Sequence, residues 1–229
     1  METIVSDDPA GRLASDLVAY LSSRGGAHIA VSGGSTPRTL FKILVNEYRA
    51  AIPWGRITIW QVDERCVPPD DPQSNWRMLK EELSSRISDL ISHRIEAERE
   101  GAAEDYEALM RRAVSNLNRF ESHTTNPQPI PQLDLVLLGM GADGHTASLF
   151  PGTAALDEHK RLFVRNEVPQ LNTHRITMTF PLINAARKRW FLVAGADKAA
   201  AFRRVQSGEL PAANVNDATW YIDPPVLGG

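Results

Sequence analysis

The segment GMGADGHT, residues 139–146, presents a carboxylate and an imidazole in one turn of glycines. Imidazole takes up and releases a proton near neutral pH, so His145 is a candidate general base. Asp143, beside it, is a second candidate catalytic residue. A single histidine is usually structural, but we expect this one at the start of a short helix, where the positive helix end favours the neutral ring. The other histidines have no such setting and are interpreted as core or surface residues: His28, His93, His123, His159 and His174.

Two nucleotide-binding patterns overlap with this segment, and both fail on context. Gly139, Gly141 and Gly144 match the dinucleotide pattern G-x-G-x-x-G, but Pro151 follows too soon for the full helix that pattern needs. The segment also matches a phosphate-binding P-loop, except that His145 stands where a lysine must reach the phosphates. We therefore interpret it as a glycine turn that presents side chains for chemistry.

A second glycine turn, Ser32-Gly33-Gly34-Ser35-Thr36-Pro37, lies between a predicted strand and a predicted helix. Thr36 suits the N-cap of that helix, and Pro37 suits its first position. Free backbone N–H groups at a helix start can bind phosphate. The alternative is a tight turn with a good cap and no ligand.

Charged side chains stand at the ends of further strand-like runs. Asp63, Glu64 and Arg65 follow one such run directly, and Lys198 follows another in the turn Gly195-Ala196-Asp197-Lys198. Arg175, at the start of a later strand, is another candidate cation. The carboxyl ends of parallel strands form the edge of a sheet where ligands bind. Each charge taken alone is more often a solvated surface residue.

Alternating strand and helix patterns predict a mostly parallel α/β sheet with helices on both faces. The expected strands are 28–32, 57–62, 133–138, 162–165, 175–180, 190–194 and 219–222, and the clearest helices are 75–91, 102–120 and 197–206. The proline-rich stretch 124–132 predicts an exposed loop within the same sheet, so we expect one domain over residues 1–229.

Composition excludes several classes of protein. The net charge of −3 gives no electrostatic basis for binding nucleic acid or an anionic membrane. A single cysteine, Cys66, cannot form an intrachain disulfide, and the acidic N-terminus lacks the features of a secretory signal. We therefore expect a cytoplasmic protein. No set of His, Cys and carboxylates has metal-ligand spacing, so we expect no metal.

These motifs, from Ser32 to Lys198, resemble the 6-phosphogluconolactonases of the pentose phosphate pathway. The most specific element is GMGADGHTASLFPG, residues 139–152. The resemblance implies a Rossmann-like three-layer sandwich and hydrolysis of a sugar-phosphate lactone without cofactors. We expect a monomer. The C-terminal stretch 218–229 departs from the family, because it ends in Pro224-Pro225 rather than a helical tail.

The same resemblance implies a role for each candidate residue. His145 would be the general base, with Asp143 in the same motif. Asp63, Glu64, Arg65 and Asn75 would orient the sugar or support the site. The phosphate would be held by Gly33, Gly34, Ser35, Thr36, Arg175 and Lys198.

Two alternatives stay open. A sugar-phosphate isomerase or deaminase of the same fold would use Asp63 to move a proton between carbons. A non-catalytic sugar-phosphate sensor should have lost His145 or an acid of the site, and none is missing.

Overall fold

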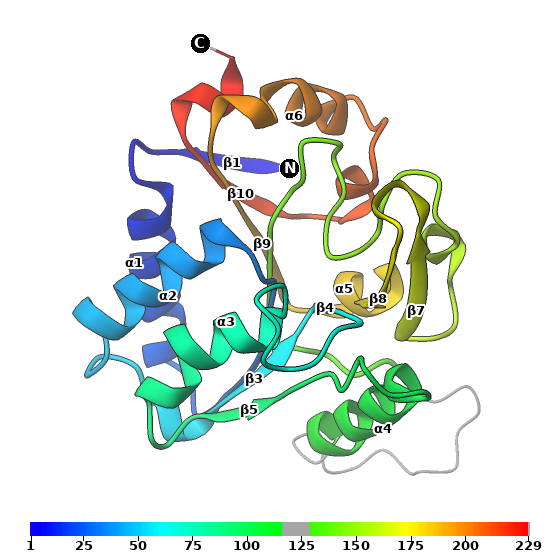
Figure 1. Ribbon diagram of the computed structural model, residues 1–229. Helices are drawn as coiled ribbons and strands as arrows, with labels where there is room; N and C mark the ends of the chain where they lie inside the picture. Colours follow the sequence, from blue (N-terminus) through cyan, green and yellow to red (C-terminus); the bar gives the residue numbers. More distant parts are fainter. Residues whose placement is uncertain (116–128, 229) are drawn as a thin grey trace.

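The computed structural model describes residues 1–115 and 129–228, and a seven-stranded sheet forms its centre (Figure 1). Every neighbouring pair of strands in this sheet is parallel, as the alternating patterns predicted. In spatial order the strands are β1 (Glu2–Val5), β10 (Thr219–Ile222), β9 (Lys188–Val193), β6 (Leu135–Leu138), β2 (Ala27–Val31), β3 (Ile57–Gln61) and β5 (Ile91–His93).

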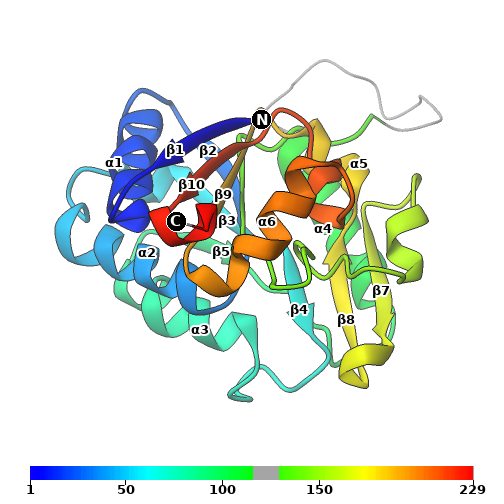
Figure 2. The same ribbon diagram turned by 90° about the horizontal axis from the view of Figure 1, so that it is seen from above.

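Alternate residues of the central strands pack into two separate hydrophobic cores. In β6, Leu135 and Leu137 face one core, whereas Val136 and Leu138 face the other. Strands buried on both faces need helices on both sides. One side is covered by α1 (Pro9–Ser22), α2 (Ser35–Glu47) and α3 (Asn75–Glu82), and the other by α4 (Ala102–Ser115), α5 (Phe180–Ala185) and α6 (Ala199–Gln206) (Figure 2). The predicted three-layer sandwich is thereby confirmed.

A second, antiparallel sheet lies on the side of α4, α5 and α6 (Figure 2). Its strands are β4 (Asp63–Arg65), β8 (Thr173–Met178) and β7 (Phe163–Val168). One prediction is corrected here, because the predicted strands 162–165 and 175–180 do not join the main sheet. Asp63-Glu64-Arg65, expected at the end of a strand of the main sheet, forms a short strand of this second sheet. The burial of β7 alternates towards its end, as expected for a strand with one exposed face.

Several predicted helices differ from those observed. The helix expected over 75–91 ends at Glu82. A separate 3-10 turn, η2 (Ser84–Arg86), follows it, and the last expected helical residue, Ile91, begins the edge strand β5 instead. The helix expected over 102–120 is confirmed to Ser115, and the rest of it, with residues 124–128 of the proline-rich loop, lies outside the described residues. The helix expected over 197–206 begins as a 3-10 turn, η5 (Ala196–Lys198), and continues as α6. Within the described parts of the chain, no helix combines the length and apolar composition needed to cross a membrane.

The first helix, α1, was not predicted, although its start signals are strong. The Asp8 side chain accepts a hydrogen bond from the Gly11 N–H at 2.9 Å, and Pro9 occupies the first turn. Leu13, Leu17 and Leu21 recur at a spacing of four and are buried against the sheet. Capping and periodicity therefore agree on this helix.

The strand order creates a crevice between β2 and β6. From β2 the chain builds β3 and β5 on one side, then returns to place β6 on the other side of β2. Ligands bind where the strand order reverses in this way, outside the carboxyl ends of the strands. The glycine turns that follow β2 and β6 therefore lie side by side at this point.

Candidate active site

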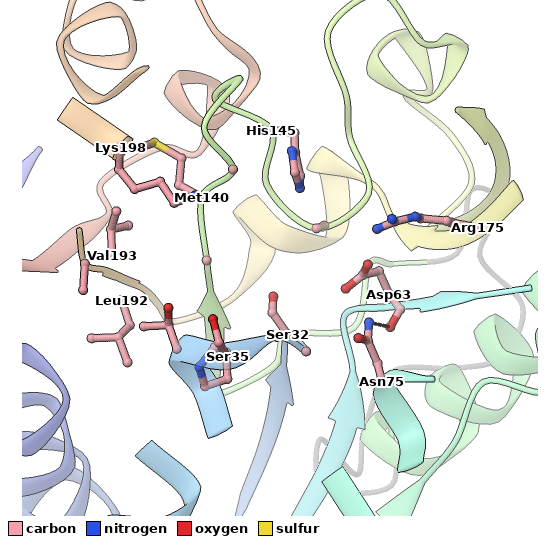
Figure 3. A pocket seen from close by; sticks show the side chains of 18 of the residues that line it. Ser32, Ser35, Asp63, Asn75, Met140, His145, Arg175, Leu192, Val193 and Lys198 are labelled. Carbon is pink, nitrogen blue, oxygen red and sulfur yellow. Dashed lines mark hydrogen bonds between the residues drawn. The ribbon is translucent and has the colours of Figure 1, made fainter. Parts of the chain in front are cut away.

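A pocket of about 220 Å³ lies at this carboxyl edge (Figure 3). Its walls come from the turns after β2, β6 and β9, from β4 and β8 of the second sheet, and from the start of α3. All the predicted site residues except Glu64 and Asp143 line it: Gly33, Gly34, Ser35, Thr36, Asp63, Arg65, Asn75, His145, Arg175 and Lys198.

His145 and Asp143 form a hydrogen-bonded pair. Nδ1 of His145 lies 2.6 Å from Oδ1 of Asp143, and the His145 backbone N–H donates to the same oxygen at 3.2 Å. Burial opposes ionisation of Asp143, but the hydrogen bonds and charge of His145 outweigh it, so the pKa of Asp143 lies below its ordinary value. An ionised carboxylate only accepts hydrogen bonds, so a neutral His145 carries its proton on Nδ1. The lone pair of Nε2 is then available on a ring that points into the cavity (Figure 3).

The helix predicted after His145 does not form, so its expected effect on the ring is wrong. Gly144 has φ 77° and Ala147 has φ 52°, and these left-handed residues break a right-handed helix. The ring is held instead by stacking on Phe150, with 3.9 Å between ring centroids. The backbone N–H of Gly141 also donates to the His145 carbonyl at 2.9 Å. Packing and a tight turn therefore position the imidazole.

The turn after β2 presents the start of α2 to the pocket. The helix begins at Ser35 with Gly34 as its N-cap, so the predicted cap at Thr36 is wrong by two positions. Gly34 has φ 114°, a conformation that glycine adopts at no steric cost, and no side chain caps the helix. In a helix start the first N–H groups have no partner within the helix, so those of Ser35 and Thr36 can bind an anion.

Lys198 approaches from the turn after β9. Its Nζ lies 2.9 Å from the Asp197 carboxylate, and this hydrogen bond lowers the pKa of Asp197. The turn is anchored from the neighbouring strand, because the Gly195 N–H donates to both carboxylate oxygens of Asp223, at 3.1 and 2.9 Å. Figure 3 shows Lys198 and Arg175 on opposite sides of the cavity.

Asp63 and Asn75 meet on the floor of the pocket. The Asn75 side-chain amide donates to the Asp63 carbonyl at 3.0 Å, and both residues are buried (Figure 3). A Cβ on Gly33 would lie 1.9 Å from Oδ1 of Asn75, so only glycine fits at that position. The Asp63 carboxylate accepts a hydrogen bond from the Ser148 hydroxyl at 2.6 Å.

Two arginines face each other across the antiparallel sheet. Arg65 and Arg175 are directly paired in the register of β4 and β8, and like charges in that position destabilise a sheet. Each Nε atom is buried without a hydrogen-bond partner in the described structure. Burial lowers the pKa of Arg175; nearby Asp63 raises it and Arg65 lowers it further. An anionic ligand between the two guanidinium groups would offset their repulsion and accept their free hydrogen bonds.

Glu64 is not in the pocket. Its carboxylate accepts hydrogen bonds from the backbone N–H groups of Arg65, Asn75 and Trp76, at 2.7, 2.8 and 2.7 Å. The side chains of Gln61 and Ser74 also donate to it. With 2% of its surface exposed, Glu64 fastens the start of α3 to the end of β4. Glu64 was predicted either to orient the sugar or to support the site, and its contacts fit the second role.

Sequence reasoning missed three residues that shape the site. Ser148 and Phe150 lie inside the segment 139–152. Their contacts with Asp63 and with the His145 ring form only when the chain folds, so no local sequence pattern indicated them. Asp223 follows β10 directly, and Asp63 follows β3 after one residue, Val62. The position of Asp223 at a strand end could therefore have identified it as a candidate site residue from the sequence.

The arrangement can hold an anion and activate a water molecule next to it. Cations and amide N–H groups surround a cavity into which one base projects. Across residues 1–115 and 129–228, no three His, Cys, Asp or Glu side chains gather as metal ligands would. Metal independence itself remains a prediction.

Comparisons with known proteins agree with this geometry. The model of one family, described as glucosamine-6-phosphate isomerases/6-phosphogluconolactonase, matches residues 2–222. The 6-phosphogluconolactonase of Haemophilus influenzae is 35% identical over 224 residues, covering 93% of this chain and 91% of that protein. A probable chloroplastic 6-phosphogluconolactonase of rice is also 35% identical, covering 94% of this chain and 69% of the rice protein. The crystal structure of 6-phosphogluconolactonase from Thermotoga maritima superposes with a TM-score of 0.79 at 27% identity, covering 97% of this chain and 100% of that one.

Proposed function

The chain belongs to the glucosamine-6-phosphate isomerase/6-phosphogluconolactonase family, and from this premise we propose that it hydrolyses 6-phosphogluconolactone to 6-phosphogluconate. The observation that carries the proposal is the pair of His145 and Asp143 beside a cation-lined pocket. A lactone needs one base and a binding site that tolerates negative charge on its carbonyl oxygen.

His145 starts the reaction. Its Nε2 takes a proton from a water molecule, whose oxygen forms a bond to the lactone carbonyl carbon. The carbonyl oxygen becomes an oxyanion. When this intermediate collapses, the bond between the carbonyl carbon and the ring oxygen breaks, and His145 returns the proton to that oxygen. The products are a carboxylic acid, which ionises at neutral pH, and a free hydroxyl group.

The charged groups divide into two tasks. The N–H groups of Ser35 and Thr36, with Lys198 and Arg175, bind the phosphate. Arg65, Asp63 and Asn75 orient the sugar. Asp143 keeps the imidazole in the tautomer whose Nε2 is unprotonated. One general base contributes roughly 10²–10⁴-fold and one oxyanion donor roughly 10²–10³-fold.

The test compares reactions on the purified protein. Initial rates of 6-phosphogluconolactone loss are measured at mildly acidic pH, and the spontaneous rate is subtracted. The same protein is assayed for deamination of glucosamine 6-phosphate and for aldose–ketose interconversion. Enzymatic lactone hydrolysis with neither of the other activities is expected. Interconversion or deamination without lactonase activity would favour Asp63 as a proton-transfer base.

We also propose that the protein acts as a monomeric single domain, without metal or cofactor, in the cytoplasm. The rice relative is named chloroplastic, so the compartment needs its own test by fractionation of the source cells.

A further inference from the structure

Two opposite charges lie close together in the pocket without pairing. Asp63 and Arg175 come from neighbouring strands of the antiparallel sheet and point toward one another (Figure 3). Asp63 is near enough to raise the pKa of Arg175. The Asp63 carboxylate nevertheless accepts a hydrogen bond from the side chain of a third residue, Ser148.

The Ser148 hydroxyl contacts both charged groups. It donates to Oδ2 of Asp63 at 2.6 Å, and Nη1 of Arg175 donates to it at 3.5 Å. A hydroxyl has one proton to donate and lone pairs to accept, so it can serve an anion and a cation at once.

The rest of Ser148 is fixed in place. Its side chain is fully buried, its N–H donates to Oγ1 of Thr177 at 3.1 Å, and its carbonyl accepts from the Asn166 amide at 2.8 Å. The hydroxyl is therefore held between the charges by the backbone.

We propose that Ser148 is a positioning residue that keeps Arg175 from forming a direct ion pair with Asp63. This inference deepens the proposed function and rests on it for its kinetic part. Because the hydroxyl occupies one carboxylate oxygen, the guanidinium stays free for the phosphate of the substrate. Ser148 does not line the pocket, and it lies on the same loop as His145, so it also links the base to the sheet that bears Asp63.

Removing the hydroxyl should let the two charges meet. In Ser148→Ala, Oδ2 of Asp63 loses its donor while buried, and the nearest replacement is the Arg175 guanidinium. Arg175 then has to break an ion pair before it binds phosphate. The expected result is a rise in KM, and in the Kd for 6-phosphogluconate, of roughly 10- to 150-fold, the range for hydrogen bonds to charged groups. The value of kcat should change much less.

The matched control is Thr179→Val. Thr179 is also fully buried near the end of β8, but its hydroxyl donates to the Arg161 and Leu162 carbonyls, away from the pocket. It should lower the melting temperature without changing KM. A double-mutant cycle of Ser148→Ala with Arg175→Ala separates positioning from general loss of stability. If Ser148 acts through Arg175, its effect on KM disappears in the Arg175→Ala background.

A crystal structure of Ser148→Ala decides the point without any activity. We expect the Arg175 guanidinium within 4 Å of the Asp63 carboxylate. An unmoved Arg175, or KM effects that multiply independently in the cycle, would overturn the inference. If the wild type fails to hydrolyse the lactone, the proposed function fails, whereas the crystal structure still tests the role of Ser148.

Discussion

Replacing Asp143 by asparagine should disable the base without removing it. The carboxylate now accepts from Nδ1 of His145 at 2.6 Å, which leaves Nε2 free to take a proton. An asparagine can instead donate its amide N–H to Nδ1. The imidazole proton would then sit on Nε2, where it blocks abstraction of a proton from water.

The magnitude follows from the geometry. A hydrogen bond to a charged group contributes about 1.5–3 kcal/mol, equivalent to roughly 10- to 150-fold in rate. Asp143 has 45% of its side chain exposed, so water screens part of its charge. We therefore expect kcat to fall roughly 10- to 100-fold in Asp143→Asn, which is less than the roughly 10²–10⁴-fold expected for loss of a base.

The assay is the initial rate of lactone hydrolysis for Asp143→Asn, His145→Asn and the double variant. Because Asp143 acts through His145, the double variant should be no slower than His145→Asn alone. Circular dichroism of each variant checks that the fold is retained. A near-normal kcat in Asp143→Asn, or losses that multiply in the double variant, would refute the assigned pairing.

Four further predictions follow from the described contacts. His145→Asn should lower kcat by roughly 10²–10⁴-fold, since an amide cannot accept the proton of water, and a normal rate in a stopped-flow assay would place the base elsewhere. Lys198→Ala should raise KM for the phosphorylated lactone much more than it lowers kcat, because phosphate contacts persist from ground state to transition state; equal rates of the wild type on gluconolactone without phosphate would contradict this. Incubation with a chelator should leave kcat unchanged, and complete loss restored by one divalent ion would reveal a metal requirement. Backbone N–H groups of Arg161 and Lys160 lower the pKa of Glu158 from its ordinary value of 4.5 to about 2. Its stabilisation is thus present above about pH 4.5 and disappears as the pH falls to about 2, so Glu158→Gln should lower the melting temperature at pH 7 but not near pH 2.

The main sheet could be predicted because its strands are buried on both faces. Runs such as Leu135–Leu138 are apolar throughout, and the turns that follow the strands contain glycine or charge. All four predicted strand-end motifs lie near the carboxyl edge of this sheet, so the pocket could be assembled from sequence alone. Each motif could be recognised from a few neighbouring residues, and the parallel order of the strands places the motifs at one edge.

The second sheet could not be predicted in the same way. β4 has three residues, all charged, and only its pairing with β8 makes it a strand. For the same reason nothing local indicated that Arg65 would face Arg175, or that Glu64 would point away from the pocket. The position of Ser148 depends on contacts with both β4 and β8, so it too became visible only in the fold.

The close contact between Gly33 and Asn75 limits how this site can change over evolutionary time. A Cβ at position 33 would lie 2.2 Å from Cγ and 2.9 Å from Cβ of Asn75, so rotating the amide cannot relieve the clash. The amide is also bonded to the Asp63 carbonyl. Any lineage that replaces the glycine must first shrink residue 75 and lose that bond. The two positions are therefore epistatic, and among relatives of this chain they should vary together or not at all.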